Sequence, residues 1–236
     1  MAGKTIEINK YYTFRNHSKG EKRAAREHPS SEAQKRINQR KAVKELRRLM
    51  NCNFSDGDLL VRLDFYKRPN ITGEEMQHCM AKCIRKLRND FAKREKQLKY
   101  IYVKEIGPRG GRHIHMLLSR CQIETLTKVW PHGGIHIDPL NSNGQYSRIA
   151  EYFIKYALKT EATEGQLIGK RYYCSRNLEK PKVTKRVIAS NKFRKEPKER
   201  KGYYLDKDSI RSGISGSTGY EFFSYTLIKQ EDRGGG

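Results

Sequence analysis

Residues 99–119, KYIYVKEIGPRGGRHIHMLLS, predict a β-hairpin. Apolar and aromatic residues fill both arms, and the glycine-rich stretch at 107–111 supplies the turn. His113 and His115 stand two apart in the second arm, so their imidazoles project from the same face of the strand. Glu105 lies near the end of the first arm. Two imidazoles and a carboxylate in this arrangement predict a divalent metal site with open positions for an oxygen-rich substrate.

A structural role for the same residues stays open. Histidines two apart in a strand are mostly ordinary surface or core residues. Strict alternation groups Glu105 with Ile101 and Val103, so its direction depends on where the turn begins. A glutamate at a hairpin end also pairs readily with an arginine of the turn, here Arg109 or Arg112.

Strand and helix patterns alternate around the hairpin and predict an α+β fold. Residues 59–65, LLVRLDF, alternate as a strand does, and Thr72 with Glu75 forms a capping box before a helix. Apolar residues at helical spacing predict the buried face of that helix: Met76, Met80, Cys83, Ile84, Leu87 and Phe91. A short helix near 123–130, a strand near 135–138 and a helix over 147–160 follow. Three strand-like pieces come later, at 171–176, 182–188 and 219–228.

The charge of the chain predicts a polyanionic partner. Lys and Arg number 50 against 26 Asp and Glu, which gives a formal net charge of +24 over 236 residues. Nucleic acid is the first candidate and an acidic membrane surface a distant second. No apolar run is long enough to span a membrane, and the N-terminus lacks the apolar core of a secretory signal. The five cysteines form no disulfide framework, so we expect free thiols in the cytoplasm of a bacterial host.

Basic residues are concentrated in the segments 1–50 and 170–201. Residues 31–34 form a capping box, and an apolar stripe follows in the order Ala33, Ile37, Val43, Leu46 and Met50, which predicts a basic N-terminal helix. We therefore expect a basic helical extension over 1–50, a catalytic core over 51–165 and a basic C-terminal segment over 166–236. The cations expected to contact DNA backbone phosphates are Arg36, Arg40, Lys44, Arg47, Arg109, Arg112, Arg171, Lys185 and Arg186. A solvated basic surface is the alternative.

The helix RIAEYFIKYALKT at 148–160 carries a second candidate catalytic group. At about 100° per residue, Tyr152, Lys155, Tyr156 and Lys159 fall on one arc, and apolar residues occupy much of the remainder. A tyrosine beside a cation or metal can act as a nucleophile. Half-buried tyrosines with snorkelling lysines are the structural alternative.

Together, the His113-Ile-His115 pattern and the downstream Tyr152-Phe-Ile-Lys155-Tyr156 pattern resemble the HUH endonuclease superfamily. The resemblance is closest to two-tyrosine rolling-circle replication initiators of bacterial plasmids, phages and integrative elements, and it covers roughly residues 35–180. It implies an antiparallel sheet with packed helices, similar to the RNA-recognition motif. It also implies nicking and joining of single-stranded DNA through a 5′-phosphotyrosine with a free 3′-hydroxyl.

The resemblance also implies roles for individual residues. Tyr152 is expected to be the first nucleophile and Tyr156 the second, with Lys155 and Lys159 stabilising phenolate or phosphate charge. Glu105, His113 and His115 are expected to hold Mg²⁺ or Mn²⁺. The chain departs from the family's first motif, which usually reads Leu-Thr-Tyr, because residues 63–65 are Leu-Asp-Phe. Asp64 shares a strand face with Arg62, and it either supports the site or forms a surface salt bridge.

The expected partners follow from the same resemblance. They are a single-stranded DNA origin, with a hairpin or duplex flank, and a host helicase and DNA polymerase, because the chain has no phosphate-binding loop of its own. We expect a monomer or a dimer. Two other readings stay open. One is a two-tyrosine single-strand transposase or a relaxase, and the other is a non-catalytic basic protein that binds nucleic acid.

Overall fold

The computed structural model describes residues 1–13, 32–68, 70–107, 109–141, 145–164, 170–188, 192–216 and 218–230. The chain divides into two compact units, one formed by residues 39–180 and the other by residues 1–38 together with 181–236. The division lies inside helix α1 (Glu32–Asn53). Each unit is described separately below.

The unit of residues 39–180 is built on a five-stranded antiparallel sheet with the order β5-β2-β4-β3-β6. Its elements after α1 are β2 (Leu59–Asp64), α2 (Gly73–Lys93), β3 (Tyr100–Ile106), β4 (Arg112–Leu118), α3 (Ile123–Val129), β5 (Ile135–Pro139), α4 (Ser147–Glu164) and β6 (Tyr173–Cys174). The run from β2 to β5 is a β-α-β-β-α-β unit, the arrangement of ferredoxin-like folds. The prediction of an α+β fold with helices packed on an antiparallel sheet is confirmed.

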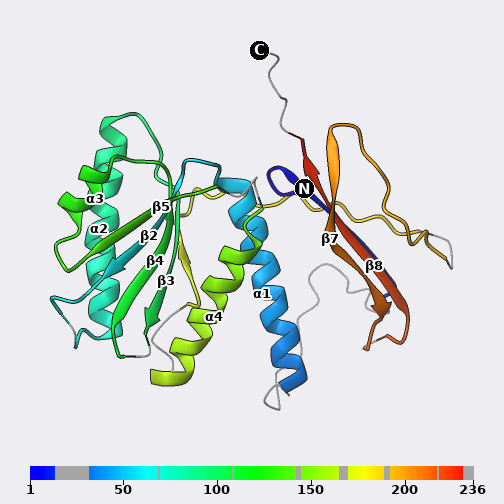
Figure 1. Cartoon of the computed structure of the whole chain (residues 1–236), viewed down its shortest axis with the longest axis horizontal. Helices are drawn as coiled ribbons and strands as arrows, with labels where there is room; N and C mark the ends of the chain where they lie inside the picture. The colour runs from blue at the N-terminus through cyan, green and yellow to red at the C-terminus, as the bar shows by residue number, and fades with distance from the viewer. Residues whose placement is uncertain are drawn as a thin grey trace, which may run out of the picture. The chain divides into compact units, whose positions relative to one another are not determined.

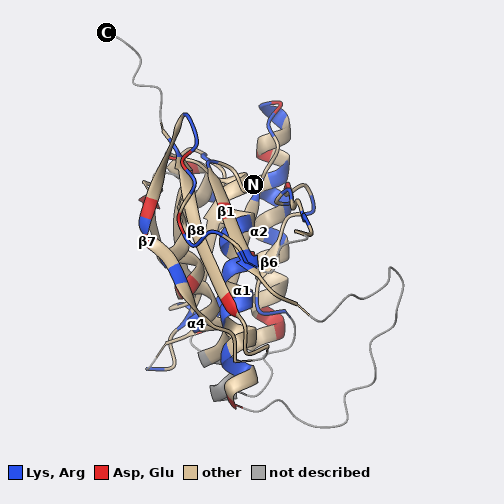
Figure 2. Cartoon of the chain, turned by 90° about the vertical axis from the view of Figure 1, so that its right-hand side faces the viewer, with Lys and Arg blue, Asp and Glu red and all other residues tan. Residues whose placement is uncertain are grey.

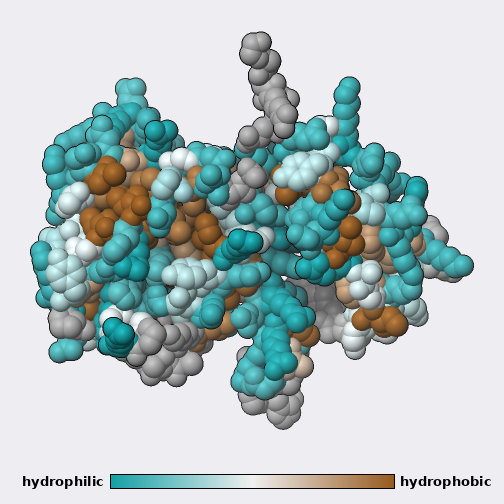
Figure 3. Space-filling model, viewed as in Figure 1, coloured by the Kyte–Doolittle hydropathy of each residue, from teal (hydrophilic) through white to brown (hydrophobic). Residues whose placement is uncertain are grey.

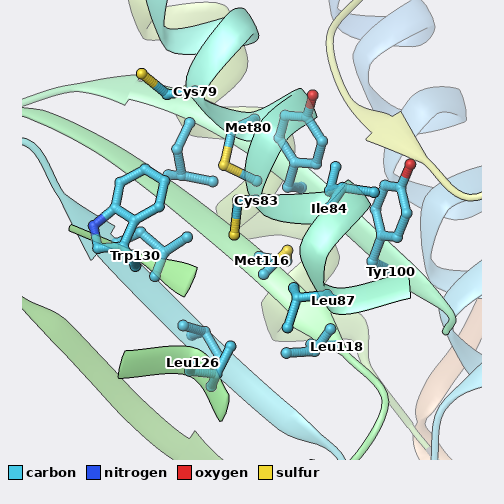
Figure 4. Packing of buried hydrophobic residues seen from close by; sticks show 14 of the residues in the cluster. Cys79, Met80, Cys83, Ile84, Leu87, Tyr100, Met116, Leu118, Leu126 and Trp130 are labelled. Carbon is cyan, nitrogen blue, oxygen red and sulfur yellow. The ribbon is translucent and has the colours of Figure 1, made fainter. Parts of the chain in front are cut away.

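Helices α2 and α3 cover one face of this sheet. The predicted stripe of α2 is buried, and it packs against the alternating residues of β2 and β4 that point to the same side. Figure 4 shows Met80, Cys83 and Leu87 of α2 lying against Met116 and Leu118 of β4. Burial of apolar area at about 25 cal/mol per Å² makes this cluster a principal source of the unit's stability.

Helix α4 and the C-terminal half of α1 cover the other face. Leu46 and Met50 of α1 and Phe153 of α4 are fully buried there against β3 and β4. Figure 1 shows α4 and α1 on the side of the sheet opposite to α2 and α3. Along β3, the residues on this face run Ile101, Val103 and Glu105, so the apolar face ends in a carboxylate beside the β3–β4 turn.

Local sequence signals set where α2 begins. The Glu75 backbone N–H donates to Thr72 Oγ1 over 3.2 Å, and the Thr72 N–H donates to Glu75 Oε2 over 2.8 Å. Both bonds of the predicted capping box are therefore present, and they satisfy amide groups that the first helical turn leaves without partners. In the part of the chain that the structure describes, no helix is both long and apolar enough to cross a membrane.

The other unit contains a three-stranded antiparallel sheet with the order β1-β8-β7. Its strands are β1 (Thr5–Tyr11), β7 (Tyr203–Ile214) and β8 (Glu221–Lys229). Phe223, Tyr225 and Leu227 of β8 are its buried core residues. Pairing of β1 with β8 joins the two ends of the chain in one sheet.

The structure differs from the expected organisation in three respects. The N-terminal segment is not only helical, because residues 5–11 form β1. The compact units do not divide at residues 50 and 165, because the second half of α1 packs on the five-stranded sheet while β1 pairs with β8. Residues 182–188 form no strand, although residues 173–174 and 221–229 do. The N-cap predicted at Ser31 lies outside the described residues.

Candidate active site on the five-stranded sheet

The register of three adjacent strands brings the predicted metal ligands and Asp64 to one face of the sheet. Glu105 of β3 lies directly opposite His113 of β4, and Asp64 of β2 lies opposite His113 on the other side. His115 lies opposite Arg62. Directly opposed residues of antiparallel strands project to the same side, so all of these side chains face α4.

Glu105 and His115 form a buried pair. His115 Nε2 lies 2.5 Å from Glu105 Oε2, and His115 and Glu105 are 5% and 6% exposed, respectively. The direction of Glu105, which the sequence left open, is therefore toward the histidines. It also groups with Ile101 and Val103, because those residues occupy the same face. A buried carboxylate bound to imidazole holds that ring in a single orientation.

Asp64 organises the other histidine. His113 Nδ1 lies 2.7 Å from Asp64 Oδ1, and Arg62 Nε donates to the same oxygen over 3.1 Å. His136 of β5 places its Nε2 3.3 Å from Asp64 Oδ2. With Nδ1–H donating to the carboxylate, the lone pair of His113 is on Nε2. Asp64 both supports the site and forms the salt bridge with Arg62, so the two alternatives are not exclusive.

Two glycines of the β3–β4 turn leave space beside His113 Nε2. A Cβ atom on Gly111 would lie 3.1 Å from this nitrogen, and one on Gly107 would lie 3.5 Å from it. Both distances are short enough for a side chain to occupy the place where a ligand of Nε2 would bind. The glycines of the GPRGG stretch therefore keep one coordinating nitrogen accessible as well as forming the turn.

Helix α4 places both tyrosines against His115. The Tyr152 hydroxyl lies 3.5 Å from each ring nitrogen of His115, and the two rings meet edge to face with centroids 5.0 Å apart. The Tyr156 ring stacks on the same imidazole at 5.5 Å. The two tyrosine rings are 4.2 Å apart. The predicted arc of α4 thus faces the predicted metal ligands.

The two predicted lysines lie on the same helix. Lys155 is exposed. Lys159 is in α4, but its side chain lies outside the described residues.

The surroundings of Tyr152 raise its pKa above the ordinary value. Burial is the largest cause, and the hydrogen bond with Tyr156 and the charge of Glu105 act in the same direction. The positive charge of Arg62 opposes them. The hydroxyl is therefore protonated at neutral pH, and attack on an electrophile requires that its proton be removed.

A groove of about 670 Å³ opens beside Tyr152. It lies over β2, β5 and α4, and its lining includes Arg62, His136, Arg148 and one acidic residue, Asp138. The surface in the view of Figure 3 is mostly hydrophilic, with smaller hydrophobic areas between the polar ones. Two arginines beside a tyrosine hydroxyl form a surface suited to a phosphate group.

The donor set suits a divalent ion, although the side chains are paired with one another. Two imidazoles and a carboxylate share one face and adjacent strands, and the glycines leave space at Nε2 of His113. Glu105 contacts His115 while His113 contacts Asp64. Within the described ranges, no three or more His, Cys, Asp or Glu side chains are grouped so as to hold a metal ion. The residues fit the group by chemistry and by face.

The cations predicted to contact DNA are distributed over both units. Most are exposed, whereas Arg47 and Arg112 are half-buried. Figure 2 shows several bands of Lys and Arg along α1, the helix that carries Arg36, Arg40, Lys44 and Arg47. Arg109 is in the β3–β4 turn, Arg171 precedes β6, and Lys185 and Arg186 follow in the unit that contains β8.

Sequence reasoning missed His136 and Arg148. His136 was visible as a histidine in a predicted strand, but its place depends on β5 pairing with β2, which no local pattern reports. Arg148 lies one turn before Tyr152 on α4, and its spacing of four residues was a usable signal for a shared helix face.

Comparison with known proteins gives one family. Residues 61–161 match the model of a family described as replication-associated proteins of the ORF2 type. None of the curated proteins and none of the solved structures gives a match. The matched segment runs from β2 to α4 and contains both tyrosines, both histidines of β4, Glu105 and Asp64, and it confirms the resemblance to replication-associated proteins. Residues 61–161, which hold the whole candidate site, carry the sequence signature of this replication-associated protein family.

Proposed function

We propose that this protein is an HUH-type endonuclease that nicks and rejoins single-stranded DNA and so initiates rolling-circle replication. The family match supports a role in DNA replication. The observation that carries the proposal is the position of the Tyr152 hydroxyl, 3.5 Å from the His115 ring nitrogens and beside a groove lined by two arginines. Nucleophile and phosphate-binding groups held together in this way supply the orientation that attack on a phosphate requires.

The reaction exchanges one phosphate ester for another. A bond forms between the Tyr152 oxygen and the scissile phosphorus, and the bond from that phosphorus to the 3′ oxygen breaks. Tyr152 gives up its proton and the leaving oxygen gains one, so the products are a 5′-phosphotyrosine and a free 3′-hydroxyl. No water takes part, so the phosphodiester energy is kept and the strand can be rejoined.

Cations around the tyrosines complete the proposed chemistry. Arg62 and Arg148 line the groove and would bind the oxygens of the scissile phosphate. Arg62 also opposes the rise in the pKa of Tyr152. Lys155 and Lys159 would stabilise negative charge on the phenolate or the phosphate. Tyr156 would be the second nucleophile, cutting the regenerated origin while Tyr152 still holds the first 5′ end.

We further propose that Glu105, His113 and His115 hold Mg²⁺ or Mn²⁺. When bound, the ion would polarise the scissile phosphate and stabilise its developing charge. Asp64 holds the ring of His113 so that Nε2 is presented, as carboxylates commonly do for metal-bound histidines.

The wider cation set would bind DNA on either side of the nick, as a hairpin or a duplex. These residues are Arg36, Arg40, Lys44, Arg47, Arg109, Arg112, Arg171, Lys185 and Arg186. A host helicase would unwind the duplex and a host polymerase would extend the 3′ end. The active form is proposed to be a monomer or a dimer.

Covalent adduct formation tests the proposed function. Purified protein is mixed with single-stranded oligonucleotides that tile both strands of its own replicon, with Mn²⁺ or with a chelator, and separated on a denaturing gel. We expect a protein–DNA band with Mn²⁺ and its loss with the chelator. His113→Ala should remove the band, whereas His78→Ala, at an exposed position on α2, should leave it.

The outcome also separates the other functions. Tight, salt-sensitive binding with no adduct on any oligonucleotide would make the chain a non-catalytic binding protein. An adduct with strands from a mobile element's ends or transfer origin, but not from a replication origin, would indicate a transposase or a relaxase.

Asp64→Asn should weaken metal use without removing the nucleophile. The amide keeps the shape of the carboxylate but not its charge, so it holds the His113 ring less firmly. We expect the Mn²⁺ concentration for half-maximal adduct formation to rise by about 10- to 100-fold. Glu74→Gln, at an exposed position in the first turn of α2, is the matched control. An unchanged Mn²⁺ requirement would show that Asp64 does not act through His113.

A further inference from the structure

A second pocket lies on the opposite face of the five-stranded sheet from the tyrosine–histidine site. It has a volume of about 580 Å³ and lies at the β3–β6 edge, beside α2. Tyr100 and Tyr102 alternate along β3 with Ile101 and Val103, so they project away from His115. The sheet itself therefore separates this pocket from the proposed nucleophiles.

Stacked tyrosine rings form one wall of this pocket. The rings of Tyr102 and Tyr173 are nearly parallel, with an interplanar angle of 10° and centroids 4.9 Å apart. Tyr100 continues the row, 6.1 Å from Tyr102. The Tyr102 hydroxyl is bound to the Gln77 amide, which holds the ring in place. Figure 4 shows Tyr100 at the edge of the buried cluster, with its hydroxyl pointing away from Leu87 and Leu118.

Cations surround the rings. The Arg88 guanidinium lies 5.9 Å from the Tyr100 ring and donates to its hydroxyl over 3.3 Å. Lys170 and Arg171 are exposed and also line the pocket. Among the described residues, no Asp or Glu takes part in the lining. Burial raises the pKa of Tyr100 and of Tyr102, so neither phenol adds negative charge.

We propose that this pocket binds single-stranded DNA that flanks the nick, stacking a base on the tyrosine row and holding adjacent phosphates with Arg88, Lys170 and Arg171. The identity of the strand rests on the proposed function. Flat aromatic walls combined with cations are the usual means of binding unpaired strands, because only an unpaired base exposes a ring face for stacking. The charge of the lining is complementary to that strand.

Binding measured in chelator tests this pocket apart from strand cleavage. The probe is a fluorescent oligothymidylate of about 20 nucleotides, long enough to span more than one binding region. Tyr173→Leu removes the ring and should weaken binding about tenfold, with an unchanged dependence on salt. Tyr173→Phe keeps the ring and should bind as the original protein does. This pair separates stacking from a general effect of altering β6.

The cations should change the salt dependence instead. Replacing Arg88, Lys170 and Arg171 with Gln should lower the slope of log affinity against log salt by about 0.7 for each phosphate that is no longer neutralised. Lys93→Gln and Lys96→Gln, at exposed positions outside the pocket, remove charge from the same unit and are the control. In the original protein, 5-iodouracil in the oligonucleotide should cross-link on irradiation to a peptide containing Tyr100, Tyr102 or Tyr173.

Failure of this inference and failure of the proposed function have different signatures. Normal adduct formation, with equal affinity for Tyr173→Leu and cross-links only elsewhere, would overturn the pocket and leave the nicking activity. Weaker binding by Tyr173→Leu at unchanged salt slope, in a protein that forms no adduct, would support the pocket and overturn the nicking activity.

Discussion

Tyr152→Phe should lower covalent adduct formation by about a thousandfold or more, because it removes the only atom of that side chain that can bond to phosphorus. The ring and its edge-to-face contact with His115 remain, so the loss is chemical rather than structural. The measurement is the rate of adduct formation on the cognate single strand. Tyr66→Phe, at a 67% exposed position outside the site, should keep the full rate.

The companion variant tests how the two tyrosines divide the work. Tyr156→Phe should retain the first adduct and lose the second cut, because its ring stacks on His115 while the Tyr152 hydroxyl approaches the ring nitrogens. An adduct in Tyr152→Phe but not in Tyr156→Phe would reverse the order. An adduct in the double variant would exclude both residues.

The raised pKa of Tyr152 adds a pH dependence to the same experiment. Its hydroxyl is protonated at neutral pH, and its phenolate fraction increases about tenfold for each unit by which the pH rises toward the pKa. The rate in the original protein should therefore rise from about pH 6 to about pH 9. A rate that falls over this range would contradict attack by this phenol.

Gly133→Ala should be the most destabilising single substitution near the site. A Cβ atom at this position would lie 2.0 Å from the Asp64 carbonyl oxygen and 2.6 Å from its carbon. Both are backbone atoms, so the 130–134 segment must move away from β2. We expect a loss of about 3 kcal/mol in the free energy of unfolding, measured by urea denaturation.

The same movement should impair the site. It would break the bond from Trp130 Nε1–H to the Asp64 carbonyl, 3.1 Å, and the bond from the Asp64 N–H to the Gly134 carbonyl, 2.9 Å. Asp64 would then hold His113 less well, so adduct formation should fall with stability. Gly216→Ala, where a Cβ meets nothing within 4 Å, is the matched control. Equal unfolding midpoints for the two variants would refute the close approach.

The elements predicted correctly are those that neighbouring residues specify. The capping box of Thr72 and Glu75 and the apolar stripe of α2 lie within one helix, and the hairpin arms and glycine turn lie within one short segment. The same holds for the tyrosine arc of α4. In each case the signal is a side-chain period or a cap, which depends on residues close in the chain.

The N-terminal segment shows where such signals end. The apolar stripe of α1 was expected to be buried throughout, yet Leu46 and Met50 are fully buried whereas Ile37 is 45% exposed. Strand β1 escaped prediction because its stability comes from pairing with β8, at the far end of the chain. Strand pairing over such separations leaves no periodic trace in either segment.

The sequence by itself determined the α+β class, the hairpin with His113 and His115 on one face, and the helix face that carries Tyr152 and Tyr156. Only the tertiary structure decided that Glu105 turns to His115, that Asp64 joins His113 to His136, and that Tyr152 meets the histidines at all. The reason is physical. Periodicity sets which way a side chain leaves its own strand or helix, but strand register and helix packing between distant segments set which side chains it meets.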